Sequence, residues 1–226
     1  PLVLVDGVEM ALQDVPATEV ESISVLKDAA SASIYGSRAA HGVILVTTKR
    51  GQEGKMKVSY DGYIGFQDRA TKPELVSARD YMEMVNEAQL NSGRKLMYTE
   101  DDILATIRGD KPYINYLDEV YKAEFVTEHT VKLTGGNESS KYMASFNYLD
   151  QPGLTANTEF KRYNFRMNAD IKVNNYVKFS SDISYRHNER LWPEGLEDAQ
   201  YQAWTMNPTT PIRYENGNYA LSQNRN

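Results

Sequence analysis

The sequence contains no cysteine, only three histidines, and no apolar run of the length that a membrane-spanning helix requires. Without cysteine there is no disulfide framework and no thiol chemistry, a composition compatible with a protein of the cell envelope. A transmembrane helix needs about 20 consecutive apolar residues, so a helical membrane span is not expected. An excess of basic residues is also lacking: the formal net charge of −6 over 226 residues argues against nucleic acid as a partner.

Motifs that carry common catalytic chemistry are missing as well. The histidines His41, His129 and His187 lie far apart and lack the spacing of a zinc-binding pair. No Gly-x-Ser-x-Gly nucleophile turn, no lysine-ended phosphate loop and no Asp-rich calcium loop occurs. Paired carboxylates such as Asp101 and Asp102 fit the first turn of a helix better than an acid–base pair. We therefore expect no enzyme activity, no metal and no cofactor.

The most informative stretch is Glu21–Gly51, which predicts a strand, a short helix, a turn and a second strand. Polar and apolar residues alternate over Ser22–Lys27, as in a half-buried strand. Gly42 then opens the continuous apolar run Val43–Val46, which is typical of a strand buried on both faces.

Local signals complete this first part of the chain. Asp28 can cap a small helix over Ala29–Tyr35, and Gly36 suits the helix end, where φ is positive. Pro1–Val5 reads as another short strand, closed by an Asp-Gly turn. Gln13–Thr18 contains a proline and predicts a loop.

From residue 56 onward, apolar residues recur with period two. In Arg162–Val173 the alternation has no exception, and in Lys141–Tyr148 only Met143 breaks it. Such strands, apolar on one face and charged on the other, fit a transmembrane β-barrel or a soluble β-sandwich, and the pattern alone leaves both open. The expected strands are Met56–Phe66, His129–Thr134, Lys141–Tyr148, Arg162–Val173 and Val177–Arg186.

The links between these strands alternate between long and short. About sixty residues, Gln67–Thr127, separate the first two strands, followed by a short link at Gly135–Ser140 and a medium one at Asp150–Glu159. Asn174 and Asn175 then give a two-residue hairpin signal. Outer-membrane barrels have short periplasmic turns and longer external loops, so this alternation would place Gln67–Thr127 outside the cell.

The longer links contain helical patterns. Ser77–Leu90 has a candidate cap at Ser77 and an apolar face at Tyr81, Met84, Val85 and Ala88. Thr99–Ile107 starts with a capping pattern and is stopped by Gly109, and Glu197–Met206 predicts a third helix. The aromatic residues of these links could stack on sugars or simply pack the loops, and loop packing is the favoured interpretation. They are Tyr81, Tyr98, Tyr113, Tyr116, Tyr121, Trp192 and Trp204.

Three segments resemble the end of the plug domain in SusC/RagA-type TonB-dependent transporters of the outer membrane. They are PLVLVDGV (Pro1–Val8), VESISVLKDAASASIYGSRAAHGVILVTTKRG (Val20–Gly51) and KVSYDGYIG (Lys57–Gly65). The resemblance implies a mainly β fold: residues 1–51 as the C-terminal part of an α+β plug domain, and residues 52–226 as the first strands of an antiparallel transmembrane barrel of about 22 strands. It also implies that the chain is a fragment, with the first half of the plug, the TonB-contacting segment and the rest of the barrel outside it. The missing signal peptide has the same explanation.

The same resemblance implies a function and its partners. It implies an importer in the outer membrane of a Gram-negative, Bacteroidota-like cell, driven by TonB and assisted by a SusD-like surface lipoprotein, with oligosaccharides or peptides as substrates. The substrate-binding residues remain unknown. The plug motif carries a structural or gating role onto Asp28, Tyr35, Gly36, Ser37, Arg38 and Gly42.

Within that motif Arg38 is expected to hold the plug to the barrel wall or to a gating segment, and the alternative is a solvated cation of the turn. By parity, the lumen-facing charges of the wall would contact the plug or water; they are Arg162, Arg166, Asp170, Lys178 and Asp182. Two other classes stay open: a receptor or adhesin that binds glycan or protein without transport, and a β-rich carbohydrate-active enzyme.

Overall fold

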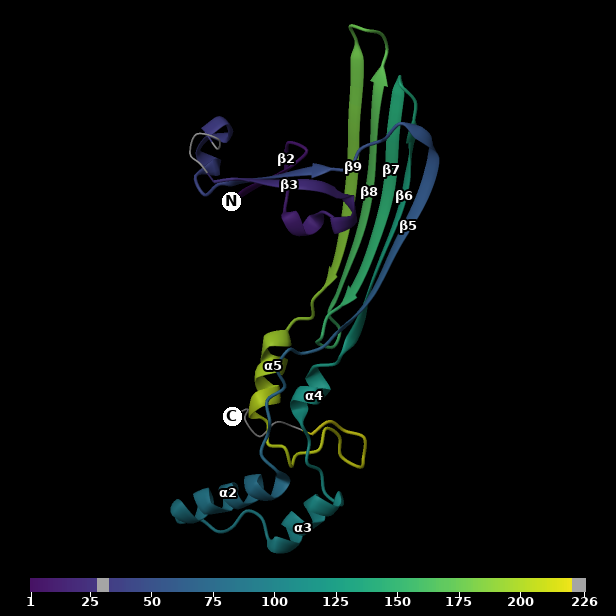
Figure 1. Cartoon of the computed structure of the whole chain (residues 1–226). Coiled ribbons are helices and arrows are strands. Elements are labelled where there is room, and N and C mark those ends of the chain that lie inside the picture. The colour runs from purple at the N-terminus through teal and green to yellow at the C-terminus, as the bar shows by residue number, and fades with distance from the viewer. Residues whose placement is uncertain (28–32, 221–226) are drawn as a thin grey trace. The chain divides into compact units, whose positions relative to one another are not determined.

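The computed structural model describes residues 1–27 and 33–220 (Figure 1). The chain divides into two compact units, each described by itself below. The first consists of Pro1–Gly65, Val126–Gln151 and Phe160–Arg190, and the second of Phe66–Phe125, Pro152–Glu159 and Leu191–Asn226. The expectation of a mainly β protein with few, short helices is confirmed.

The first unit begins with a four-stranded sheet in the order β2-β1-β4-β3. Strand β1 runs parallel to β4, with Leu4 opposite Leu45, while β2 and β3 are antiparallel to their neighbours. The predicted Asp6-Gly7 turn is present, with φ of 47° and 89°, the left-handed conformation that a tight hairpin needs. The strands are β1 (Leu2–Val5), β2 (Val8–Glu9), β3 (Val20–Leu26) and β4 (Val43–Thr48).

A small apolar core supports this sheet. Val43, at the start of β4, is completely buried and packs with Leu2, Leu4 and Ala39. The connections contain three 3-10 segments instead of plain loop: η1 (Leu12–Asp14), η2 (Ala17–Glu19) and η3 (Ser33–Ala39). The proposed cap Asp28 and most of the helix expected over Ala29–Tyr35 lie outside the described residues.

The second sheet of this unit has five long strands in chain order, β5-β6-β7-β8-β9, which run side by side in Figure 1. Strands β6 and β7 are antiparallel, with His129 opposite Tyr148. The strands are longer than the predicted segments. The alternation of polar and apolar residues stops before the strand ends, whereas the hydrogen bonds between strands continue. They are β5 (Gly54–Gln67), β6 (Glu124–Gly136), β7 (Ser140–Pro152), β8 (Glu159–Lys172) and β9 (Lys178–Leu191).

The predicted alternation separates the two faces of this sheet. On β8 the apolar residues Phe165 and Met167 are about 40% exposed, whereas Asn168 is 1% exposed. Met143, the one apolar residue that breaks the alternation on β7, lies on the polar face and is only 2% exposed, so it is buried there although it is apolar. On β7 and β8 the apolar side chains therefore point outward and the polar side chains are covered, the reverse of a water-soluble sheet.

The hairpin between β8 and β9 differs from the two-residue turn that Asn174-Asn175 predicted. Neither asparagine has positive φ, which the usual two-residue hairpin turns of type I′ and II′ require. Instead the Asn174 side chain accepts hydrogen bonds from the backbone N–H of Tyr176 and Val177, at 2.8 and 2.9 Å. These side-chain hydrogen bonds stabilise a wider turn in place of the tight hairpin. The link between β8 and β9 is therefore longer than the two residues that the sequence predicted.

The second unit contains the helices. Ser77 caps α2, and Thr99 forms a capping box with Asp102 at the start of α3, which ends at Gly109 in the left-handed conformation, all as predicted. The helix α4 was not predicted, since its five residues are too few to show a helical period. The helices are α2 (Ala78–Asn91), α3 (Glu100–Arg108), α4 (Tyr116–Val120) and α5 (Leu196–Thr205).

The buried face of α2 corrects one expectation. Met84, assigned to the apolar face, is 61% exposed, whereas Met82 is 1% exposed. The helix carries methionines two residues apart, on opposite sides, so the sequence alone gave no reason to prefer one.

The loop tyrosines mostly pack within the second unit. Tyr81 and Tyr113 meet edge to face with ring centroids 6.2 Å apart, and the Tyr116 hydroxyl donates to the carbonyl of Thr210 at 2.6 Å. Trp192 and Trp204, in contrast, are exposed. Within the described residues, no helix has the length and apolar character needed to cross a membrane.

Candidate functional site: the seam between the small sheet and the strand wall

The candidate site lies inside the first unit, where residues 1–51 meet the polar face of strands β6–β9. We call this set of contacts the seam. Strand β8 dominates it, because five successive residues on its polar face each contact the first 51 residues of the chain. They are Arg162, Asn164, Arg166, Asn168 and Asp170.

Arg166 forms the most buried charge pair of the seam. Its guanidinium donates to the carboxylate of Asp6, at the β1–β2 turn, and only 10% of the Arg166 side chain and 17% of the Asp6 side chain is exposed. The same carboxylate accepts from Thr48 of β4, through the backbone N–H at 3.0 Å and the hydroxyl at 2.7 Å. Asp6 therefore joins the first strand, the last strand and the wall.

The protonation of Asp6 follows from these partners. Burial raises the cost of the charged form, but the two hydrogen bonds from Thr48 and the positive charge of Arg166 outweigh it. As a result, the pKa of Asp6 lies below its ordinary value, and the carboxylate is charged at neutral pH.

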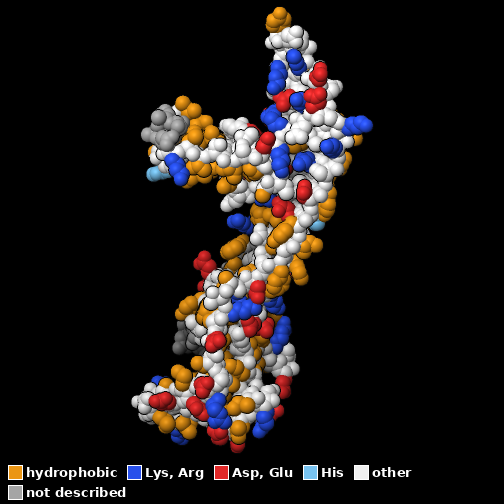
Figure 2. Space-filling model, viewed as in Figure 1, with side chains coloured by type: hydrophobic (Ala, Val, Ile, Leu, Met, Phe, Trp, Pro, Cys, Tyr) orange, Lys and Arg blue, Asp and Glu red, His pale blue; other side chains and the backbone are white. Residues whose placement is uncertain are grey.

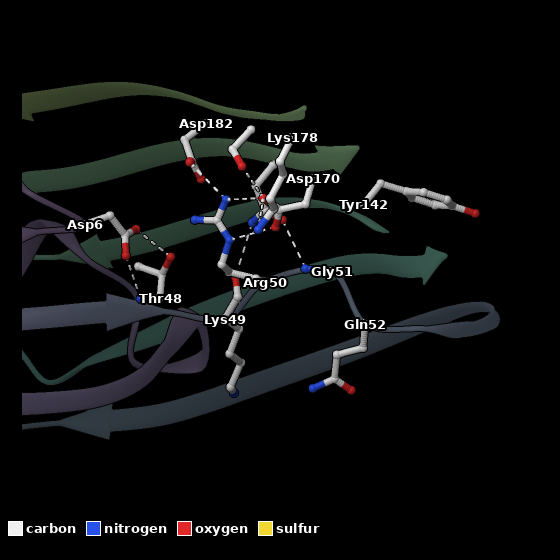
Figure 3. A network of polar contacts seen from close by, with 12 residues as sticks. Asp6, Thr48, Lys49, Arg50, Gly51, Gln52, Tyr142, Asp170, Lys178 and Asp182 are labelled. Carbon is white, nitrogen blue, oxygen red and sulfur yellow. Dashed lines mark hydrogen bonds and ion pairs between the residues drawn. The ribbon is translucent and has the colours of Figure 1, made fainter. Parts of the chain in front are cut away.

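Arg50 forms a second charged contact two residues after β4 (Figure 3). Its Nε lies 3.2 Å from Asp170 on β8 and its Nη2 lies 3.1 Å from Asp182 on β9, so one guanidinium spans two strands. Burial disfavours the charge, yet the hydrogen bonds and charges of both carboxylates raise the pKa of Arg50 above its ordinary value. We call this three-residue contact the Arg50 clasp.

Between these charged contacts, Asn168 satisfies the backbone of the chain as it leaves β4. Its amide oxygen accepts the N–H of Gly51 at 3.0 Å, and its amide nitrogen donates to the carbonyl of Lys49 at 3.3 Å. A Cβ atom on Gly51 would lie 2.4 Å from the backbone nitrogen of Tyr142, so only glycine permits this approach to β7.

The loop before β3 makes further contacts with the wall. The Arg162 guanidinium donates to the Gln13 carbonyl at 2.6 Å, and Asn164 donates to the carbonyl of Asp14 at 3.2 Å. These contacts satisfy backbone groups that the loop leaves unpaired.

Two side-chain contacts extend this loop to the neighbouring strands. Glu19 is 4% exposed and accepts from the Ser145 hydroxyl at 2.7 Å, while the hydroxyls of Thr18 and Thr130 lie 3.3 Å apart. Ser145 belongs to β7 and Thr130 to β6, so the seam extends from the charged pairs on β8 and β9 to all four strands β6–β9.

A small cavity of about 290 Å³ opens beside this loop. Asn164 and Arg166 line it, and among the described residues the Asn164 Oδ1 and Arg166 Nε atoms have no hydrogen-bond partner. A buried donor and a buried acceptor beside a cavity of this size are suited to ordered water.

The described residues of the predicted plug motif make none of the seam contacts above. Tyr35 packs against the core of the small sheet, and the Ser37 carbonyl accepts a turn hydrogen bond. Gly36 and Gly42 both have positive φ, and a Cβ on Gly42 would lie 3.0 Å from the carbonyl oxygen of Leu26. The backbone conformation explains why glycine occupies both positions. A role of these glycines in gating stays a prediction.

Arg38 pairs with Glu9 of β2 at 2.6 Å, and both side chains are more than half exposed. Its ion pair thus lies within the first 51 residues. The charges of these residues that pair across the seam are Asp6, Arg50 and Asp14, whose carboxylate lies 2.6 Å from the Arg186 guanidinium of β9. Sequence reasoning missed all three as site residues, although Asp6 lies in the quoted PLVLVDGV segment and Arg50 in the quoted TTKRG ending.

The contacts of the seam are noncovalent. Among the described residues, no group of three or more His, Cys, Asp or Glu side chains is arranged to hold a metal ion. The seam consists of ion pairs, amide contacts and hydroxyl contacts between two surfaces. Such contacts can hold two parts of a chain together and can be separated without breaking a covalent bond.

This architecture, a small sheet held against the polar face of long, outward-apolar strands, is that of a plug and its barrel wall. The TonB-dependent Receptor Plug Domain family model matches residues 1–43. A TonB-dependent receptor of Formosa agariphila is 30% identical over 97% of this chain and 22% of its own length. The TonB-dependent receptor SusC of Bacteroides thetaiotaomicron is 28% identical over 94% of this chain and 21% of its own length.

Solved structures show the same fold. The RagAB peptide importer in its 'open-open' state gives a TM-score of 0.72 at 22% identity, over 86% of this chain and 25% of that chain. Its 'closed-closed' state gives 0.69 at 26% identity, over the same shares of both chains.

Together these similarities support the resemblance noted in the sequence: the chain is similar to SusC/RagA-type TonB-dependent transporters, and its first 43 residues match their plug domain. The chain spans about a fifth of the length of the curated relatives it matches.

Proposed function

We propose that this chain is the plug-to-barrel junction of a SusC-like importer in the outer membrane. Residues 1–51 would form the end of the plug, and residues 52–226 the beginning of the barrel wall, with an external link at about 67–127. The observation that carries the proposal is the run of five β8 side chains that each hold the first 51 residues. A gated channel needs such a contact surface between the gate and its frame.

The complete protein would import oligosaccharides or peptides into a Gram-negative cell. The names of the relatives support the TonB dependence and the peptide cargo, since SusC is a TonB-dependent receptor and RagAB is a peptide importer. Oligosaccharide cargo follows from the resemblance of the sequence. TonB would supply the energy through a segment outside this chain, and a SusD-like lipoprotein would assist capture at the surface. Outer-membrane lipid would surround the apolar face of the strands, and the chain would have no catalytic role.

A disulfide lock tests the gating role of the seam. The hydroxyls of Thr18 and Thr130 lie 3.3 Å apart, close enough for a pair of cysteines to bridge the plug and β6. The chain has no cysteine of its own, so Thr18→Cys/Thr130→Cys introduces the only pair within it. We expect cells carrying this variant of the complete protein to lose uptake when the pair is oxidised and to recover it on reduction.

A matched control lies within the wall. Thr130 and Asn147 are direct cross-strand partners on β6 and β7, so Thr130→Cys/Asn147→Cys bridges two strands and leaves the plug free. Uptake that persists in the oxidised plug-to-wall variant would contradict the proposal and favour a receptor or adhesin that binds without transport. Loss of uptake in both variants would show that oxidation itself, not the lock, blocks the protein.

A further inference from the structure

A second cavity of the first unit lies where strands β7, β8 and β9 end at the short turns. Its volume is about 530 Å³, within the range of small-ligand sites. One lysine from each strand lines it: Lys141, Lys172 and Lys178. Arg50 and Asp170 of the Arg50 clasp line it as well. Figure 2 shows Lys and Arg side chains near this end of the strands, with Asp and Glu side chains among them.

The charge of this cavity is opposite to that of the chain. Its lining contains four cationic and two acidic side chains, while the whole chain carries a net charge of −6. The cationic residues are the three lysines and Arg50, and the acidic residues are Glu138 and Asp170. The excess positive charge is therefore local and belongs to this cavity.

The acidic residues of the lining pair with only one of the three lysines, Lys178. Asp170 is already held by Arg50 and by the Ser180 hydroxyl at 2.6 Å, and the Lys178 ammonium reaches it only at 3.8 Å. For Lys141 and Lys172, no carboxylate within the described part of the chain lies at ion-pair distance. Neighbouring ammonium groups repel one another, and an anion between them removes that repulsion.

Neutral groups complete the site. Ser139 and Ser140 line the cavity, and their hydroxyls can donate hydrogen bonds. The backbone N–H of Lys172 donates to the Ser139 carbonyl at 2.7 Å, which fixes the β6–β7 turn beside the end of β8. The lysines and serines are thus held on neighbouring, hydrogen-bonded elements.

We infer that this cavity binds an oxyanion, a phosphate or sulfate group, through Lys141, Lys172 and Lys178. Ammonium groups bind such anions as compact charges with strong, charge-assisted hydrogen bonds. The inference goes beyond the proposed import function and does not depend on it. The anion can be free in solution or carried by a sugar that passes the site, and its chemistry is the same in both cases.

The test uses the complete protein in detergent and isothermal titration with inorganic phosphate at constant, low ionic strength. We expect saturable binding that weakens at least tenfold in Lys141→Gln/Lys172→Gln. The matched control, Lys57→Gln/Lys95→Gln, removes the same charge from exposed lysines outside the cavity and is expected to bind phosphate as the unmodified protein does.

Two results would overturn the inference: no saturable phosphate or sulfate binding, or equal weakening in both double variants. A comparison of inorganic phosphate with glucose 6-phosphate separates the two sources of the anion. Tighter binding of the sugar phosphate indicates an anion carried by cargo, and tighter binding of inorganic phosphate indicates a free ion. Since binding is measured without uptake, its failure leaves the disulfide-lock test of import intact.

Discussion

Arg166 of β8 and Asp6 of the β1–β2 turn form an ion pair across 160 residues of sequence, and both side chains are largely shielded from water. The pair joins the wall to the first strand of the plug, and Thr48 extends it to the last strand. An uncompensated charge at this place would be costly, so the pair holds the plug only as long as both partners are present.

The first prediction concerns the loss of one partner. Arg166→Met leaves the Asp6 carboxylate buried without its cation, at a cost of about 3 kcal/mol to the plug–wall contact. We expect the complete Arg166→Met protein in planar bilayers to show increased conductance at a lower urea concentration than wild type, because the plug is held less firmly. Arg38→Met is the matched control: the Arg38–Glu9 pair is largely exposed, and such pairs contribute about 0–1 kcal/mol. Equal shifts in the two variants would show that burial of the pair does not matter.

The second prediction concerns pH. The pKa of Asp6 is lowered in the folded chain, from an ordinary value of 3.8, so its contribution is present above that value and is lost as pH falls through the folded pKa. We expect the difference in urea midpoint between wild type and Asp6→Asn to be the same at about pH 7 and pH 5, and smaller at about pH 3. A difference that already changes between pH 7 and pH 5 would contradict the assigned direction.

The third prediction concerns the close approach of the plug end to β7. Gly51→Ala places a methyl group 2.4 Å from the Tyr142 backbone nitrogen, and backbone cannot yield as a side chain can. We expect a destabilisation of about 1–3 kcal/mol, measured as faster amide exchange at residues 49–53. Gly62→Ala meets only the flexible end of the Tyr60 side chain, so it serves as the control and should leave exchange in that segment unchanged.

The fourth prediction concerns the second unit. Thr99→Ala removes the capping box of α3, which should cost about 1 kcal/mol and raise amide exchange in the first turn of that helix. Thr71→Ala, in an exposed link, should change nothing there. If the α3 amides of the Thr99→Ala variant exchange as slowly as those of wild type, the packing of Ile103 and not the cap fixes this helix end.

Several elements could be predicted because their cause is local. The Asp6-Gly7 turn, the Ser77 cap and the Gly109 stop each depend on residues within one turn of the chain. The errors arose where local patterns are ambiguous, as with Met82 and Met84, or where a side chain offers a competing hydrogen bond, as at Asn174.

The sequence by itself determined which residues of each strand share a face, because side chains alternate strictly along an extended backbone. That placed Arg162, Arg166 and Asp170 together on the polar side of β8. Only the tertiary structure decided their partners: the carbonyl of Gln13, the carboxylate of Asp6 and the guanidinium of Arg50. Those partners lie more than a hundred residues away in the sequence. A local sequence pattern cannot predict which distant surface covers a strand. The covering surface is what turned solvated charges into buried, paired ones.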